Sequence, residues 1–487
     1  MSNILRDKRV QFICVFALIF SLIPTLFRNV IPYDMIENLY WGKELQLGYA
    51  KHPPLFAWVS FAFFKIFGSI PESLYFLTQL NLLVGCCFIY KISRLLNHDK
   101  STSISSVLFL LASVATTFGN TKLNATTILF SLLPAIYFFF LRMMKFQKIS
   151  DAVFLGIFAM LACIGKYIAL MFLGCIGLFL ICDNQARKLM KTLLPYIAVF
   201  AFLIAISWHI NWMYQSDFIS LKYGLEKSVS AVSNRWSAVN FILMIILFFG
   251  TSTLALFYSS KTHDVINHCI SKYRFCYSSE ERFVIMITVA PIIILFIMSL
   301  TTGMNIGSFW GASLCPLIGV YFNILNQDVN HERLFKFTKI STLIFAIIMT
   351  LQLSVGRNYW KHHDASEAIN ATKLVCCIEN DCYNRFGEKH ISFIHADKAT
   401  AFLHAYLHDS PKFYDANKFN QLQIFDNYEI KGIHLVTFLC HKDDNKISEF
   451  IDKYNELIEI SGLVHIIDDF YVYYAFIDIE EKHNEKD

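Results

Sequence analysis

Long apolar runs recur through the first 355 residues of this 487-residue chain. A membrane-spanning helix needs about 20 mostly apolar residues. Only 16% of the residues are charged, against about 25% in average soluble domains. The sequence therefore predicts a mainly α, polytopic membrane protein with about 11 transmembrane helices. The predicted spans lie near 10–28, 72–90, 103–119, 123–141, 151–165, 167–182, 192–213, 238–258, 283–301, 308–325 and 338–355.

Two apolar segments do not have the length of one ordinary span. The run at 151–182 is too long, so we split it into two short helices with a turn at Gly165-Lys166-Tyr167. The segment 54–67 is too short and is typical of an interfacial or re-entrant helix. The first run follows Arg6, Lys8 and Arg9 without a small-residue cleavage site, which predicts a retained anchor rather than a signal peptide.

The Lys and Arg residues of the connecting loops are distributed unequally between the two sides of the membrane. One side carries 19 of them and the other carries 8 before the C-terminal tail. Because cytoplasmic loops are enriched in Lys and Arg, we expect the richer side to be cytoplasmic. The loop 29–71 would then face outward, and an odd number of spans would place the tail on the same side.

From about Arg357 onward the apolar runs give way to mixed sequence, which predicts a second domain at 357–487 after a membrane domain at 1–356. Short stretches rich in β-branched and aromatic residues predict strands, and two segments have helical spacing. We therefore expect a small α/β domain outside the membrane. The predicted strands are 391–396, 433–439, 463–467 and 470–477, and the helical segments are 399–407 and 446–460.

The cysteine spacing and the net charge bear on whether the chain contains a disulfide, a zinc site or a nucleic-acid-binding surface. Most of the 13 cysteines lie in apolar runs, but Cys377 or Cys376 could close a short disulfide loop with Cys382 in an oxidising compartment. A zinc site is less expected because no paired CxxC spacing occurs. The net charge of +4, without a dense basic patch, argues against nucleic-acid binding.

The first outer loop concentrates polar residues beside apolar sequence, in the stretch IPYDMIENLYWGKELQLGYAKHPPLFAW. Asp34 and Glu37 are three residues apart, so a helix would place both carboxylates on one face. Lys51 and His52 stand directly before an apolar segment. An ordinary solvated loop with an aromatic belt is the alternative, but charge in this position favours a polar site at the membrane surface.

Further polar residues occur at membrane depth, namely Lys122, Asn124, Lys166 and His209. Intramembrane ionisable groups are costly and usually face a cavity. Each lysine alone is explained by snorkelling to the interface. Together, the two acids of the first outer loop and the three lysines at 51, 122 and 166 lie on one side of the membrane. This combination suggests a bound anion beside a carboxylate base, which suits a phosphate-bearing lipid. We interpret His209, in WHINW, as a packing or belt residue.

These motifs resemble a known family. Asp34 and Glu37, with WGKELQLGY and KHPPLFAW, are similar to the first outer loop of bacterial family-39-type glycosyltransferases, relatives of the protein O-mannosyltransferases and of the lipid A aminoarabinose transferase. TKLNATTILFSLLP, GKY at 165–167 and TTGMNIGSFWGASLCP resemble later family segments. The resemblance covers roughly residues 10–355.

The resemblance implies a GT-C fold, a helix bundle whose active site lies in a cavity at the outer face. It implies inverting transfer of a sugar from a polyprenyl-phosphate donor; no cofactor is expected, and a divalent metal is left open. Asp34 matches the catalytic acid of the first loop, the presumed base. The commonest family pattern has Asp directly followed by Glu, so the match of Glu37 is less direct. The predicted substrate-binding residues are Lys51, which matches the donor-phosphate position, His52, Lys122, Asn124, Lys166 and Tyr167.

We therefore expect an enzyme of the bacterial inner membrane that acts at the periplasmic face on an envelope acceptor, with lipid A or another glycolipid favoured. A transporter or flippase of lipid-linked sugars is one alternative, although transporters usually show repeated halves and this sequence shows no repeat. A protein O-glycosyltransferase is another. A structural scaffold would leave the charged outer loop unexplained.

Overall fold

The computed structural model describes residues 6–478 apart from 231–235, 261–276, 305–307, 327, 355–368, 398, 409–410, 416–431, 442–451, 453–457 and 468–469. The chain divides into two compact units. The first, here called the bundle unit, comprises Met1–Ile23, Leu45–Val59 and Leu74–Met349. The second, here called the sheet unit, comprises Pro24–Glu44, Ser60–Ser73 and Thr350–Asp487.

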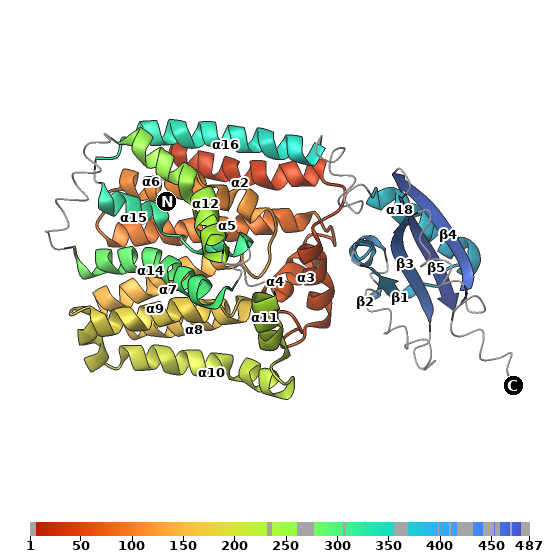
Figure 1. Cartoon of the computed structure of the whole chain (residues 1–487), viewed down its shortest axis with the longest axis horizontal. Coiled ribbons are helices and arrows are strands. Elements are labelled where there is room, and N and C mark those ends of the chain that lie inside the picture. Colours follow the sequence, from red (N-terminus) through yellow and green to blue (C-terminus); the bar gives the residue numbers. More distant parts are fainter. Residues whose placement is uncertain are drawn as a thin grey trace. The chain divides into compact units, whose positions relative to one another are not determined.

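The bundle unit consists of helices that pack side by side (Figure 1). Seven helices in the described part of the chain are long and apolar enough to cross a membrane. They are α2 (Lys8–Phe27), α5 (Ser73–Leu95), α7 (Leu129–Phe146), α10 (Leu194–Gln215), α12 (Ser237–Ser259), α14 (Ser279–Thr302) and α16 (His331–Ser354). The shorter helices are α6 (Lys100–Leu111), α8 (Ile149–Gly165), α9 (Ala169–Cys182), α11 (Ile219–Ser230) and α15 (Ile318–Leu325).

The mainly α membrane fold is confirmed, with fewer long helices than the eleven predicted spans. The predicted span 103–119 is α6 followed by a segment at Val114–Asn120 that is bent from it by 74°. Ser113 accepts a hydrogen bond from the backbone of Thr116 at this bend, so a side chain competes with the helical ladder. The predicted span 308–325 contains only a short 3-10 helix, η4 (Ser308–Ser313), and α15. Pro316 lies between them and disfavours helical backbone before it.

Small residues let neighbouring helices approach closely, as expected in a membrane where packing drives helix association. A Cβ atom at Gly156 of α8 would collide with the backbone carbonyl of Ala198 on α10. A Cβ atom at Gly85 of α5 would likewise collide with the carbonyl of Phe130 on α7. These contacts fix α8 against α10 and α5 against α7.

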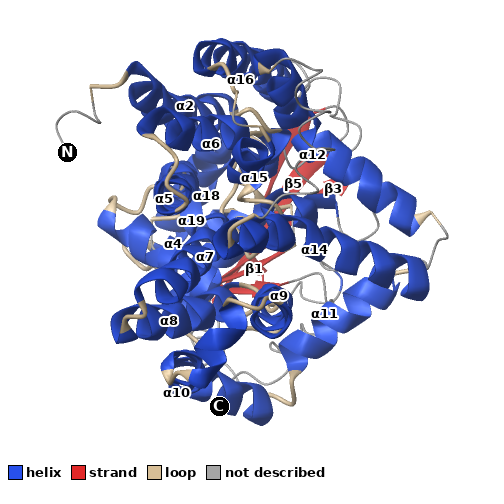
Figure 2. Ribbon diagram, turned by 90° about the vertical axis from the view of Figure 1, so that its left-hand side faces the viewer, coloured by secondary structure: helices blue, strands red, loops and turns tan. Residues whose placement is uncertain are grey.

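The sheet unit contains α3 (Tyr33–Glu44), most of α4 (Leu55–Ile66), α18 (Ala371–Phe386), α19 (Leu403–Tyr406) and a five-stranded sheet, whose strands are red in Figure 2. The strand order is β2-β1-β3-β5-β4; β1 pairs in parallel with β2 and β3, and β5 pairs antiparallel with β3 and β4. Its core includes Val436, Phe438, Tyr473 and Ala475. The strands are β1 (Ile391–Ala396), β2 (Lys412–Asp415), β3 (Ile433–His441), β4 (Ile458–Ile467) and β5 (Phe470–Asp478).

All four predicted strands are present as β1, β3, β4 and β5, which confirms a small sheet domain. The prediction of a helix at 446–460 is wrong at its C-terminal end, because Ile458 and Ile460 belong to β4 and pair with β5. Most of its remaining residues lie outside the described part. Of the other helical segment, 399–407, only α19 is α-helical.

The predicted short disulfide loop is wrong. Cys376, Cys377 and Cys382 all lie in the continuous helix α18. Five residues of α-helix rise about 7.5 Å, whereas bridged cysteines have Cα atoms less than about 7 Å apart. Asn370 begins this helix by accepting a hydrogen bond from the backbone of Lys373, a cap that the sequence analysis did not recognise.

Candidate functional site

The two candidate catalytic acids lie on one helix, α3. Asp34 is in its first turn, where the helix dipole stabilises a negative charge. Glu37 follows one turn later and is only 7% exposed. The helix begins tightly, because the backbone amides of Met35 and Ile36 both bond the carbonyl of Pro32. The backbone therefore fixes where the two acids are attached to the helix.

Contacts within the sheet unit hold α3 in place. Asn38 Nδ2 donates to Ser60 Oγ at 3.2 Å, and the Tyr40 ring meets the His404 ring edge-on at 6.2 Å. The hydroxyl of Tyr406 accepts from the backbone amide of Ile31 at 3.3 Å. The same hydroxyl donates to Glu72 Oε1 at 2.7 Å. The short helix α19 of the C-terminal tail thus anchors the segment that carries Asp34.

Lys51 and His52 lie in the loop 45–54 of the bundle unit, and both are partly buried. The backbone amide of Tyr49 bonds the carbonyl of His52 at 3.0 Å, which closes the loop on itself. The His52 ring packs edge-on against Phe56 at 5.7 Å and against Tyr223 of α11 at 6.3 Å. These contacts hold the Lys-His pair in a defined conformation.

Lys122 and Asn124 lie in the largely non-helical connection 112–128 between α6 and α7. Asn124 Oδ1 accepts hydrogen bonds from the amides of Thr126 (2.9 Å) and Thr127 (3.0 Å). Thr127 Oγ1 donates to the carbonyl of Lys122 at 2.8 Å, and Asn81 of α5 bonds the carbonyl of Thr127 at 2.8 Å. These hydrogen bonds satisfy part of the irregular backbone, so the connection forms a polar end of the bundle.

Lys166 lies in the break between α8 and α9, where the sequence predicted a turn. The side chain is buried, with an exposure of 8%. Lys166 Nζ donates to Thr126 Oγ1 at 2.5 Å. Snorkelling to water does not explain this lysine, because its ammonium group is directed into the polar connection next to Asn124.

Tyr167 and His209 connect this break to the loop that carries Lys51. The Tyr167 hydroxyl lies 3.1 Å from His209 Nε2 and 2.8 Å from Ser220 Oγ. His209 Nδ1 lies 2.9 Å from the carbonyl oxygen of Leu47. A carbonyl only accepts, so Nδ1 carries a proton and donates to Leu47. If the ring is neutral, Nε2 accepts from Tyr167. Sequence reasoning treated His209 as a packing residue, although histidine within an apolar span was a signal.

In the bundle unit, hydrogen bonds join three segments that carry predicted site residues. Lys166 connects the 165–169 break to the connection 112–128, and His209 connects the same break to the loop 45–54. The sequence analysis missed Asn120, whose two amide atoms are buried and have no hydrogen-bond partner among the described residues. Gln79 Oε1 is also buried and has no hydrogen-bond partner among these residues. Gln79 Nε2 donates to the backbone carbonyl of Asn120 at 3.2 Å. Buried polar groups of this kind normally bond a protein group or an ordered water.

The described part of the chain contains no group of three or more His, Cys, Asp or Glu side chains arranged to hold a metal ion. The candidate groups described above are the carboxylates of α3 in the sheet unit and the cations and amides at the polar end of the bundle unit.

Comparisons place this geometry among known folds. The sequence model of a family described as dolichyl-phosphate-mannose-protein mannosyltransferase matches residues 51–212. No curated protein sequence matches the chain significantly. The structure of ArnT from Cupriavidus metallidurans, bound to undecaprenyl phosphate, superimposes with a TM-score of 0.67 at 12% identity. That match covers 96% of this chain and 97% of ArnT.

Two larger proteins superimpose on the chain with TM-scores below 0.5. The oligosaccharyltransferase AglB from Archaeoglobus fulgidus matches at 0.43 with 11% identity, over 88% of this chain and 69% of AglB. The mycobacterial arabinofuranosyltransferase AftD matches at 0.45 with 10% identity, over 95% of this chain and 40% of AftD. The chain has the ArnT-like GT-C fold.

Proposed function

We propose that this protein is an inverting glycosyltransferase that moves a sugar from a polyprenyl-phosphate donor to an envelope acceptor, lipid A or another glycolipid, at the outer face of a bacterial inner membrane. The observation that carries the proposal is Lys166, whose buried ammonium lies within the polar end of a GT-C bundle. A buried ammonium is costly unless an anion or hydrogen bonds offset the desolvation. A lipid phosphate supplies such an anion.

Two further observations support this donor class. The ArnT structure, which shares the fold over nearly the full length of both chains, holds undecaprenyl phosphate. The matching family is described by a dolichyl-phosphate-linked sugar as its donor, and its match begins at Lys51 and includes Lys122 and Lys166. Lysine is a compact point charge that neutralises phosphate well. We assign phosphate neutralisation to Lys51 and Lys166, with His52, Lys122, Asn124 and Tyr167 lining the donor site.

In the proposed reaction, Asp34 accepts the proton of the acceptor hydroxyl or phosphate while that oxygen attacks C1 of the sugar. The bond between C1 and the phosphate oxygen breaks on the opposite side, and the polyprenyl phosphate leaves with its electron pair. Back-side displacement inverts the configuration at C1. Glu37 orients the acceptor, because it is buried on the same helix and one turn away.

The test compares envelope composition between a deletion strain and complemented strains. Mass spectrometry of lipid A, other envelope glycolipids and glycoproteins should show one sugar lost on deletion and restored by the wild-type chain. Lys166→Met should fail to restore it, whereas Lys222→Met, which removes an exposed lysine paired with Asp217 on the surface, should restore it fully. A sugar missing only from proteins would overturn the glycolipid acceptor. Unchanged glycans would overturn the proposed transfer.

A further inference from the structure

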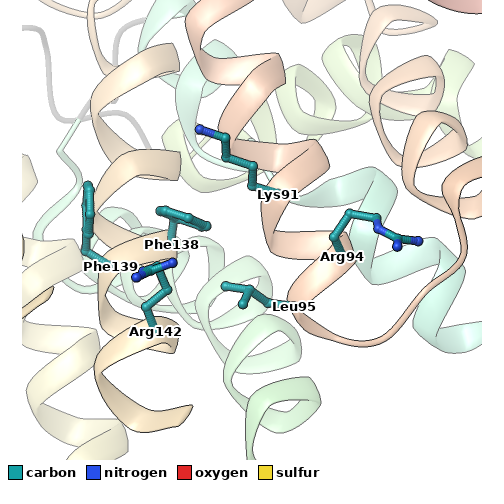
Figure 3. Close-up of a pocket in the computed structure, with 6 residues that line it drawn as sticks. All are labelled: Lys91, Arg94, Leu95, Phe138, Phe139 and Arg142. Carbon is teal, nitrogen blue, oxygen red and sulfur yellow. The ribbon is translucent and has the colours of Figure 1, made fainter. Parts of the chain in front are cut away.

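A second cationic site lies at the end of α7 that is distant from the candidate site. The 18 residues of α7 span about 27 Å, close to the thickness of a bilayer's hydrocarbon core. At its C-terminal end, α5 and α7 line an open surface pocket of about 510 Å³. Its lining residues are Lys91, Arg94, Leu95, Phe138, Phe139 and Arg142 (Figure 3).

Two of the cations are arranged around one aromatic ring. Lys91 Nζ lies 5.7 Å and Arg142 Cζ lies 5.5 Å from the centre of the Phe138 ring. Figure 3 shows Phe138 between these two side chains in projection, whereas the guanidinium of Arg94 is turned away from them. Arg94 donates to the carbonyl of His98 at 2.7 Å and so lies at the edge of the pocket.

The pocket carries an excess of positive charge. Among the ion pairs of the described residues, its cations have one carboxylate partner, Asp151, which bonds Arg142 Nε at 2.7 Å. No hydrogen bond within the described part of the chain uses the Lys91 ammonium or the two terminal nitrogens of Arg142. These donors are available to an external anion, and a phosphate oxygen is the acceptor that Arg and Lys side chains favour.

An apolar surface adjoins the cations. The Phe139 ring stacks on Phe154 and Phe158 of α8, with ring centres 5.1 and 5.3 Å apart. The Phe154 side chain is 46% exposed. A free phosphate ion would use only the cations, whereas a phospholipid would also cover these rings with an acyl chain. The chemistry of the site therefore matches a molecule with an anionic head and an apolar body.

We propose that this pocket binds the headgroup of an anionic glycerophospholipid in the leaflet on the Lys- and Arg-rich side of the membrane. Basic pockets between membrane helices at the cytoplasmic side bind anionic headgroups, and each Lys or Arg near the surface contributes about fivefold in affinity. Lys91 and Arg142 hold the phosphate, and Phe139 with its stacked partners contacts the chain. The lipid would thereby fix α5 and α7, the helices that support the 112–128 connection, without taking part in glycosyl transfer.

Native mass spectrometry of the full chain in detergent, titrated with phosphatidylglycerol or phosphatidylcholine, tests this site. We expect the wild type to retain phosphatidylglycerol preferentially and Lys91→Gln to weaken its binding about fivefold. The double variant Arg142→Gln/Asp151→Asn should weaken it further, and it removes the ion pair without leaving a buried carboxylate uncompensated. Lys339→Gln is the matched control, because Lys339 also lies over a phenylalanine, Phe335, on α16 but outside this pocket.

Inorganic phosphate distinguishes a lipid site from a simple anion site. Millimolar inorganic phosphate should leave phosphatidylglycerol bound if the acyl contact contributes as proposed. Complete displacement by phosphate, or equal retention of both lipids by the wild type, would overturn the proposal. So would unchanged binding in Lys91→Gln, whose exposed side chain is not needed for folding; its unfolding temperature, matched to that of the wild type, verifies this.

Discussion

The burial of Lys166 bears directly on the proposed function. A lysine that only anchored a helix end would extend to the interface, where its charge is solvated. This side chain is buried instead and bonds Thr126 in a polar connection between two helices. Charges at membrane depth are retained mainly where function requires them. The burial of this residue therefore argues against anchoring alone, and phosphate neutralisation is the role that we propose for it.

Asp34 is the residue on which the proposed mechanism depends. General-base catalysis contributes about 10²–10⁴-fold to the rate, so Asp34→Asn should lose at least a hundredfold in turnover while folding and donor binding persist. Glu37→Gln should lose less if Glu37 only orients the acceptor. Glu44→Gln, at the exposed end of the same helix, is the control. The measurement is the turnover of the three variants and the wild type at matched membrane abundance. A fully active Asp34→Asn enzyme would refute the assignment of Asp34 as the base.

Lys51 allows a separate test of donor binding. A charge-assisted hydrogen bond contributes about 1.5–3 kcal/mol, so Lys51→Ala should weaken use of the lipid-phosphate donor by about ten- to a hundredfold. Lys65→Ala removes an exposed lysine of α4 that packs over Phe61 and Phe64, and it should have no effect. Donor affinity is measured in nanodiscs containing each purified variant. Equal affinities for the Lys51 variant and the wild type would remove Lys51 from the site.

At the scale of elements, the loop 45–54 is held against α10 by close contacts rather than by regular structure. The indole of Trp58 donates to the carbonyl of Gln46 at 3.0 Å and stacks on Trp208 at 5.5 Å. His209 bonds Leu47, and Gly48 lies so near Trp212 that a Cβ atom at this position would overlap the indole. The loop therefore acts as a packed element that positions Lys51.

Gly48→Ala tests this packing. The added methyl group must displace Trp212, which should loosen the loop and increase amide hydrogen exchange in residues 45–54. We expect the free energy of unfolding to decrease by about 1–3 kcal/mol, which is typical of overpacking. Gly174→Ala on α9 is the control, because a Cβ atom there meets no atom within 4 Å. If the Gly48→Ala variant exchanged these amides at the wild-type rate, the Trp212 ring would be able to move aside without loosening the loop.

Two buried histidines make the sheet unit sensitive to acid. Burial lowers the pKa of His404 in α19 to about 4 and that of His395 in β1 to about 3. The usual pKa is about 6.5, so the unfolded chain binds more protons between pH 6.5 and 4. Stability is therefore complete above pH 6.5 and declines as the pH falls toward 4. The lowered pKa of His404 corresponds to about 3 kcal/mol of unfolding free energy, which is lost as the pH falls from 6.5 to 4.

Hydrogen exchange in β1 and β3, measured from pH 7 to pH 4, tests this linkage. After correction for the intrinsic pH dependence of exchange, protection should decrease in the wild type, and the decrease should be smaller in His404→Gln. His390→Gln, which alters an exposed histidine, should behave as the wild type does. A pH profile of His404→Gln identical to that of the wild type would show that the buried histidine is not linked to stability.

The sequence predicted the elements whose pattern is local. The alternating β-branched and aromatic residues of β1 and β5 predicted strands, and the apolar runs of α10 and α12 predicted spans. The part that could not be predicted depends on contacts between distant residues. Ile458 and Ile460 had helical spacing, but pairing with β5 determined their conformation. Similarly, the hydrogen bond between Lys166 and Thr126 joins residues 40 positions apart, and no local pattern indicates it.

At the scale of the whole molecule, different charged and polar groups lie at the two ends of the bundle. One end holds buried polar groups around Lys166 and Asn124, and the other holds the exposed Lys91 and Arg94 of α5 and the half-buried Arg142 of α7. Lys and Arg accumulate on the cytoplasmic side of membrane proteins. The candidate site should therefore open to the outer side, which is where a donor and an envelope acceptor would meet.

The last prediction concerns this orientation. Residues 29–71 and 357–487 should both face outward, because the loops on their side carry few Lys and Arg. A single cysteine introduced at Asn29 or Lys389, in a background without other reactive cysteines, should react with a membrane-impermeant maleimide in intact spheroplasts. A cysteine at Lys148, on the cationic side, should react only after the membrane is opened. Labelling at Asn29 without labelling at Lys389 would place the tail on the cytoplasmic side. The anchoring of α3 by Tyr406 would then be impossible, since no hydrogen bond could join Tyr406 to Ile31 and Glu72 across a bilayer.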